Sequence, residues 1–170
     1  MTQDDSSTAT ADPGQVQSLV NAQNAAMANP KFAPNTPSPG VTHCSESSFF
    51  VAQQVGAKTD GILGARGENF DANTQIQNLA NPANGYAAVT PDQAQDLANQ
   101  GIVAFATQVR EPHGHIASVR PQGVSGDNPT GLTGPLLANV GLFNGVAHQS
   151  MVFTPTHGAI VYYAPNSNAG

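Results

Sequence analysis

The chain has 170 residues, of which only 9% are charged, and its net charge is −6. An ordinary globular protein has roughly a quarter charged residues, but 39% of this chain is hydrophobic, which excludes a disordered polyelectrolyte. The five Lys and Arg residues are scattered, so we expect neither a nucleic-acid interface nor attraction to an anionic membrane.

The amino-terminal residues predict a polar leader followed by a helix. Residues 1–14 are expected to be disordered, and they lack the basic and apolar regions of a secretory signal. Apolar residues at helical spacing predict a helix over 15–28, and the proline-rich run at 29–40 predicts a loop. No later segment approaches the roughly 18 apolar residues that span a bilayer. We therefore expect a chain made in the cytoplasm without a cleavable signal.

The only cysteine of the chain lies in the segment 42–56. Its apolar residues predict a helix ended by Gly56, with Thr42 or His43 as the N-cap and Cys44 in the first turn. At that position, free backbone N–H groups and the helix dipole favour a thiolate and can hold an oxyanion. The alternative is a small buried core residue, but the polar neighbours of Cys44 make it a poor core residue.

Two more helices are expected before the sequence pattern changes. One begins near Asp71, with Ala72, Ile76, Leu79 and Ala80 as its apolar stripe, and Pro82 ends it. The other begins with the capping-box sequence 90–93 and ends at Gly101.

Strands are predicted after Gly101, because the residues there become β-branched and aromatic between glycines and prolines. The clearest strands are at 102–109, 115–119 and 159–165, and weaker ones are at 136–143 and 150–153. Helices followed by strands predict an α+β domain, with N-terminal helices packed on one antiparallel sheet. We expect a single catalytic domain over 15–165 and a short tail at 166–170.

A nucleophilic cysteine needs a histidine partner, and the chain has five histidines. The side chain of His43 points away from its neighbour Cys44 on a helix. His115 follows Gly114 and opens the strand at 115–119, where a strand end can present an imidazole over a helix terminus. His115 is therefore the predicted base, and a third polar group would hold its ring.

These motifs, in this order, resemble the NlpC/P60-type cysteine peptidases, and most closely the amidase effectors delivered by bacterial type VI secretion. The resemblance covers most of residues 16–164, and Ser47, Ser48 and Ser118 depart from the family pattern without removing a catalytic atom. The matching segments are Cys44 to Gly56, Asp71-Ala72-Asn73, the helix ending AQDLANQG, the strand IVAFA, Gly114 to Val119 and the closing strand VYYA.

The resemblance implies a papain-like fold that hydrolyses amide bonds in the peptide stems of peptidoglycan, typically between D-glutamate and meso-diaminopimelate. Cys44 would attack as the thiolate, and His115 would take the thiol proton and later protonate the leaving amine. The backbone N–H groups of Cys44 and Ser45 would hold the oxyanion. Asn139 is the candidate for orienting the histidine, and it can equally be a turn or strand-edge asparagine. No metal and no cofactor are implied.

The family also suggests where the protein acts and which alternatives to test. A type VI effector would be exported to the cell wall of a target cell, and we expect a monomer inhibited by a cognate protein that covers its cleft. The alternatives are a phage or self lysin of the same chemistry and a catalytically inert module that binds cell-wall peptides or a protein. A zinc site built from His113, His115 and either His148 or His157 is a further alternative.

Overall fold

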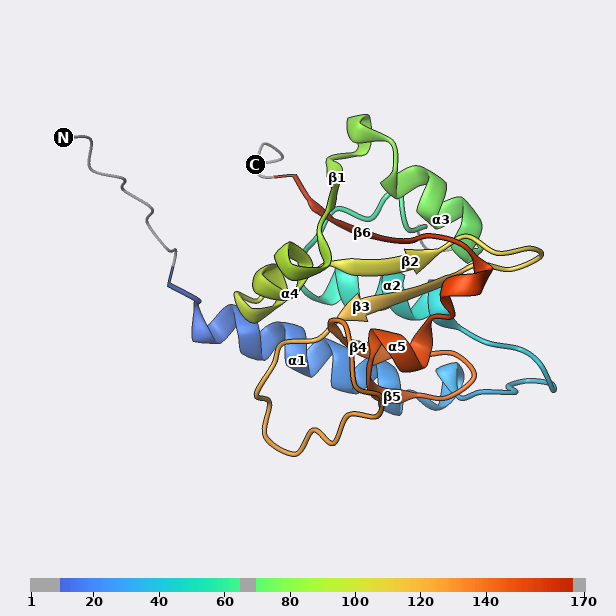
Figure 1. The fold of residues 1–170 in the computed structure, drawn as a ribbon, viewed down its shortest axis with the longest axis horizontal. Helices are drawn as coiled ribbons and strands as arrows, with labels where there is room; N and C mark the ends of the chain where they lie inside the picture. Colours follow the sequence, from blue (N-terminus) through green and yellow to red (C-terminus); the bar gives the residue numbers. More distant parts are fainter. Residues whose placement is uncertain (1–9, 65–69, 167–170) are drawn as a thin grey trace.

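The computed structural model describes residues 10–64 and 70–166, and its centre is a six-stranded antiparallel sheet (Figure 1). The strand order is β1-β6-β2-β3-β4-β5, so β6, which comes last in the chain, lies between β1 and β2. The strands are β1 (Tyr86–Val89), β2 (Phe105–Gln108), β3 (His115–Val119), β4 (Leu136–Asn139), β5 (Gly145–His148) and β6 (Ile160–Pro165). The predicted α+β class, with helices on one antiparallel sheet, is confirmed.

The helices precede and interrupt the strands. The α-helices are α1 (Pro13–Ala28), α2 (Cys44–Gln54), α3 (Ala72–Leu79), α4 (Pro91–Asn99) and α5 (Gln149–Val152). Short 3₁₀ turns are η1 (Pro30–Phe32), η2 (Pro82–Asn84) and η3 (Pro155–His157). Within residues 10–64 and 70–166, no helix has both the length and the apolar character needed to cross a bilayer.

The first helix begins earlier than predicted. The Asp12 carboxylate accepts a hydrogen bond from the backbone N–H of Gly14 at 2.8 Å, and Pro13 occupies the first helical position. Both features stabilise a helix start, so α1 begins at Pro13 rather than at residue 15. The predicted leader, residues 1–14, therefore extends two residues too far, because residues 13 and 14 belong to α1. Residues 1–9 lie outside the described part of the chain.

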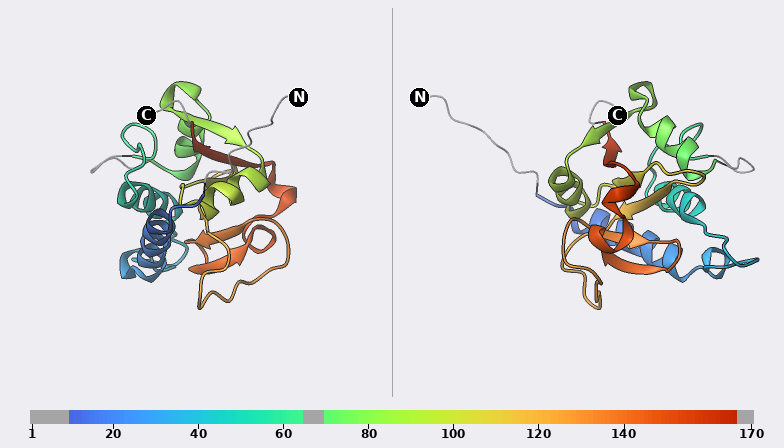
Figure 2. Two further views of the ribbon diagram at one scale, coloured as in Figure 1. Left: turned by 90° about the vertical axis from the view of Figure 1, so that its left-hand side faces the viewer. Right: turned by 45° about the vertical axis from the view of Figure 1, so that its right-hand side comes forward.

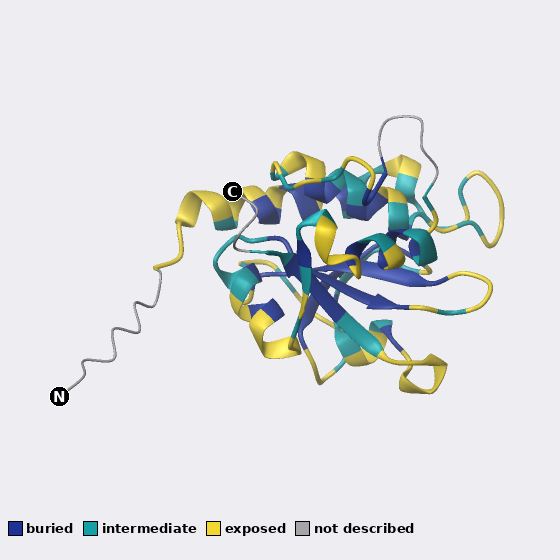
Figure 3. Cartoon of the chain, turned by 90° about the horizontal axis from the view of Figure 1, so that it is seen from above, coloured by how far each residue is buried: buried dark blue, intermediate teal, exposed yellow. Residues whose placement is uncertain are grey.

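The helices α1 and α2 lie together on one side of the sheet, where α2 packs against β3 and α1 against β4 (Figure 2). Every residue of β2, β3 and β4 is buried (Figure 3). Because successive strand residues point to opposite faces, these strands are covered on both faces. The first residue of β3 is therefore held in a packed environment on each side.

Local patterns in the middle of the chain are mostly confirmed. Thr90 Oγ1 accepts from the Gln93 N–H at 3.1 Å, and Gln93 Oε1 accepts from the Thr90 N–H at 2.9 Å, which is the predicted capping box. Gly56 adopts a φ of 72° just after α2, a left-handed conformation that favours glycine. Ala80, expected on the buried stripe of α3, is instead its exposed C-cap.

Three elements differ from the sequence prediction. The edge strands β1 and β5 were not predicted, and β1 lies between two helices, so helices and strands are not fully separated along the chain. Residues 150–153, a predicted strand, belong mostly to the helical turn α5. There the Ser150 hydroxyl accepts hydrogen bonds from the N–H groups of Leu132 and Thr133 at 3.3 and 3.2 Å. These hydrogen bonds hold Ser150 within the helical turn despite the high β propensity of Val152, and Phe153 after the turn is extended.

Candidate active site

Cys44 is the first residue of α2, as predicted, but its side chain is buried as part of the hydrophobic core. The expectation that its polar neighbours make it a poor core residue is therefore wrong. The first N–H groups of a helix have no intrahelical carbonyl partner. At this terminus the N–H groups of Cys44 and Ser45 lie near the Cys44 sulfur, and so does the N–H of Ile116 on β3. The cysteine is thus held between a helix start and the strand that begins with His115.

His43 is not available as a base for the Cys44 thiol, although the two residues are adjacent in sequence. Its Nε2 lies 2.7 Å from the carbonyl oxygen of Thr36, and its Nδ1 contacts the Glu46 carboxylate. Both ring nitrogens are therefore used at the N-cap of α2, where His43 anchors the incoming loop.

His115 and Asn139 form a hydrogen bond. The Nε2 atom of His115 lies 2.8 Å from Oδ1 of Asn139, whose own Nδ2 donates to the carbonyl oxygen of Phe143 at 2.7 Å. Since Nδ2 must face that carbonyl, Oδ1 faces the ring and accepts from Nε2–H. This assigns the tautomer in which Nδ1 is the free, basic nitrogen.

The strand register explains why these side chains meet. Ser118 pairs with Ala138 and Val119 with Leu137. Continuing this register places Gly141 opposite His115, and Asn139 two residues away on the same face. A Cβ atom at Gly141 would lie 3.0 Å from Cε1 of His115, so only glycine leaves full room for the imidazole.

Burial decides the charge state of the pair. It is the main cause that raises the pKa of the Cys44 thiol, and it outweighs the nearby N–H groups of Ile116, Ser45 and Cys44 and the charge of Arg110. Burial also lowers the pKa of His115 to about 4, although the bond to Asn139 acts in the opposite direction. The resting pair is therefore a neutral thiol and a neutral imidazole. The expectation that the helix start makes Cys44 a resting thiolate is wrong, because it omitted desolvation.

This correction predicts slow alkylation of the folded protein. Because only the thiolate reacts and its pKa is raised, the rate of Cys44 modification by iodoacetamide should be low at pH 6 and still rising above pH 9. Intact-mass spectrometry over a pH series measures it. The same chain unfolded in urea is the matched control. Its alkylation rate should stop rising with pH once the pH exceeds the ordinary thiol pKa of about 8.5. Rapid labelling of the folded protein at pH 6 would contradict the neutral resting state.

The histidines of the zinc alternative are not gathered around one point. His113 and His157 line a pocket with Arg110 and Glu111, while His148 Nδ1 lies 2.9 Å from the carbonyl oxygen of Gly134. Over the described ranges, no group of three or more His, Cys, Asp or Glu side chains could hold a metal ion.

Several neighbours of the site carry no recognisable sequence signal. Gln75 Nε2 donates to the carbonyl oxygens of Ser45 and Leu63 at 2.9 and 2.6 Å, which ties the first turn of α2 to α3 and to the preceding loop. Asn73, within the quoted Asp71-Ala72-Asn73 motif, donates to the carbonyl oxygen of Arg110 at 2.9 Å. These amides fix the backbone around the thiol, and nothing in their local sequence predicts their partners.

Comparison of the chain with protein-family models and with curated proteins returned no match. The candidate site therefore rests on its geometry and on the motifs in the sequence. The roles of Cys44, His115, Asn139 and Ser45 stay predictions.

Proposed function

We propose that this protein is a cysteine amidase that hydrolyses amide bonds in the peptide stems of peptidoglycan. The observation that carries the proposal is the His115–Asn139 hydrogen bond at the start of β3, against which the cysteine-bearing terminus of α2 packs. A cysteine on a helix, a histidine on a strand and an asparagine that orients the ring are the parts a papain-like site requires.

The proposed reaction begins with the neutral pair. Nδ1 of His115 takes the Cys44 thiol proton as the sulfur forms a bond to the substrate carbonyl carbon. The carbonyl oxygen becomes an oxyanion, which the N–H groups of Cys44 and Ser45 stabilise. The C–N bond then breaks, and the imidazolium returns the proton to the leaving amine. Water, deprotonated by His115, hydrolyses the thioester and restores the thiol.

Asn139 acts on the histidine rather than on the substrate in this scheme. Its Oδ1 accepts from Nε2–H in both protonation states of the ring, so the imidazolium that forms during attack keeps a buried acceptor. The bond to Phe143 keeps the amide from turning its Nδ2 toward the ring. Asn139 is accordingly proposed as a positioning residue.

The stem bond between D-glutamate and meso-diaminopimelate is the proposed target, supported by the resemblance of the Cys44 and His115 motifs to NlpC/P60-type effectors. In that context the protein is an exported antibacterial toxin that acts as a monomer in the cell wall of a target cell, and a cognate inhibitor covers its cleft. A lysin of the same chemistry would use the same residues.

Digestion of purified sacculi tests the proposal. The wild-type protein should release peptide fragments whose new amino terminus is diaminopimelate and whose new carboxyl terminus is the γ-carboxyl of D-glutamate, as identified by mass spectrometry. Protein alkylated at Cys44 under denaturing conditions and refolded is the control. Binding to sacculi without any new terminus would contradict the enzyme and favour the inert binding module.

A further inference from the structure

A pocket near the start of β3 contains the side chain of Arg110 together with two histidines. It has a volume of about 310 Å³ and is lined by Arg110, Glu111, His113 and His157. Arg110 follows β2, and its charge acts on both Cys44 and His115. The pocket residue His113 also comes two residues before His115, so the pocket adjoins the chain segment that leads into β3.

The side-chain amides of Asn73, which is half-buried, and Gln108, which is buried, donate hydrogen bonds that position the backbone around this pocket. Asn73 donates to the backbone carbonyl of Arg110 at 2.9 Å, which fixes the chain where it leaves β2. Gln108 Nε2 donates to the carbonyl oxygens of Thr154 and Gly158, each at 2.8 Å. These two carbonyls bracket η3, so Gln108 holds the turn that carries His157 against the end of β2. In Figure 1, η3 lies near the base of the β2–β3 connection.

The packing around Gly114, which follows the pocket residue His113, leaves no space for a larger side chain. A Cβ atom at Gly114 would lie 2.2 Å from Oδ1 of Asn73 and 3.0 Å from the carbonyl oxygen of Gln108. Glycine at this position lets the chain pass directly under α3 between His113 and His115. The same short segment therefore positions both the pocket that contains Arg110 and the proposed catalytic histidine.

Arg110 has unused hydrogen-bonding capacity at this place. Its Nε is buried and has no hydrogen-bond partner within residues 10–64 and 70–166. Between described residues, the ion pairs are His43–Glu46 and Arg120–Asp127, and neither involves Arg110. Glu111 lines the same pocket but is exposed, and Asp71 lies near His113, so Arg110 is the permanent cation among the lining residues and forms no ion pair with Glu111. A buried donor of this kind ordinarily has an acceptor.

We propose that Arg110 binds a carboxylate of the substrate in this pocket, next to the amide bond that Cys44 attacks. A guanidinium binds a planar carboxylate through two parallel N–H bonds, which fixes orientation as well as charge. In a γ-linked stem, the α-carboxylate of D-glutamate is free and lies beside the bond to diaminopimelate. This inference rests on the proposed function, and it makes Arg110 the specificity-determining residue for an unamidated stem.

The test separates binding from turnover. Isothermal titration of the Cys44→Ala variant with the tripeptide L-Ala-γ-D-Glu-diaminopimelate should show about 10- to 100-fold tighter binding than with the same peptide carrying D-isoglutamine. Arg110→Gln in this background should abolish that difference, Arg110→Lys should keep part of it, and Lys58→Gln, which removes an exposed cation, should keep all of it.

Each outcome bears on one proposal. Equal binding of the two peptides, or an unchanged preference in Arg110→Gln, would overturn the carboxylate subsite, even if the wild-type enzyme cleaves both peptides. Selective binding of the acidic peptide without cleavage by the wild-type chain would overturn the amidase and leave the subsite in place. If Arg110 served only to tune the thiol, Arg110→Gln would shift the pH profile of Cys44 alkylation and leave the peptide preference intact, which also contradicts the subsite.

Discussion

The Cys44→Ala variant is expected to lose at least about 1,000-fold of the proposed stem-peptide hydrolysis rate, because the thioester intermediate requires the Cys44 sulfur. Cys44 is the only cysteine of the chain, so no neighbouring thiol can substitute for it. The released amine can be quantified against time with a synthetic stem peptide or with sacculi.

The fold should survive this change, which makes the loss interpretable. Cys44 lies at the edge of the core, and removing one sulfur atom leaves a small cavity, for which we expect a loss of about 1 kcal/mol in the free energy of unfolding. The His115→Ala variant should be comparably inactive, and the double variant no slower than either single one, because the two residues act as one unit. Activity of Cys44→Ala within tenfold of wild type would contradict the thiol mechanism.

The candidate site was predictable where local sequence determines position. The polar first turn and the apolar residues that follow it place Cys44 at a helix start, and the glycine and β-branched pattern places His115 at a strand start. Asn139 could be proposed because consecutive strands are usually neighbours in a sheet. Its contact with His115 also depends on the β3–β4 register, which the sequence alone leaves open.

The remaining features depend on contacts between distant segments. The edge strands β1 and β5 have four residues each, include alanine or glycine, and form by pairing with β6 and β4. Around the site, the side chains of Gln75 and Gln108 donate hydrogen bonds to backbone carbonyls of other segments. The backbone carbonyl of Arg110 accepts a hydrogen bond from the Asn73 side chain. Residue types alone also failed to give the charge state of Cys44, because desolvation depends on how the folded chain covers it.

The low content of charged residues has a structural counterpart in such amides. Gln23 Nε2 donates to the carbonyl oxygen of Val119 at 2.8 Å, and Gln95 Nε2 donates to that of Arg120 at 2.8 Å. Gln95 Oε1 also accepts from the N–H of Leu136 at 2.8 Å. Neutral amides therefore satisfy buried backbone groups between helices and strands, where a charged side chain would carry a larger desolvation penalty.

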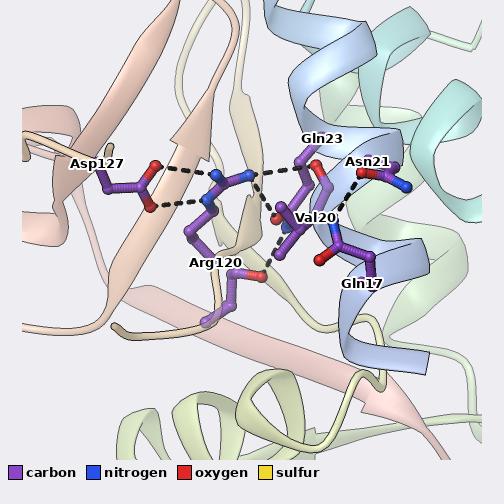
Figure 4. Close-up of polar contacts among 7 residues, drawn as sticks. Gln17, Val20, Asn21, Gln23, Arg120 and Asp127 are labelled. Carbon is purple, nitrogen blue, oxygen red and sulfur yellow. Dashed lines mark hydrogen bonds and ion pairs between the residues drawn. The ribbon is translucent and has the colours of Figure 1, made fainter. Parts of the chain in front are cut away.

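Arg120 is the exception, because it is a charged side chain with only 1% exposure. Its Nε and Nη2 each donate to a different carboxylate oxygen of Asp127 at 2.9 Å. Its Nη1 lies 3.3 Å from the carbonyl oxygen of Val20 and 3.4 Å from Oε1 of Gln23 (Figure 4). One guanidinium therefore joins α1, the end of β3 and the loop that follows.

The Arg120→Met variant is expected to lower the free energy of unfolding by about 3–5 kcal/mol, because it leaves the partly buried Asp127 carboxylate and the α1 acceptors unpaired. Urea denaturation measures the loss. Lys58→Met, at an exposed cation, should change stability by no more than about 0.5 kcal/mol. Adding Asp127→Leu to Arg120→Met should recover part of the loss, since the uncompensated charge is then removed. A loss below about 1 kcal/mol in the single variant would show that water satisfies Asp127 and that the pair does not hold α1 to the sheet.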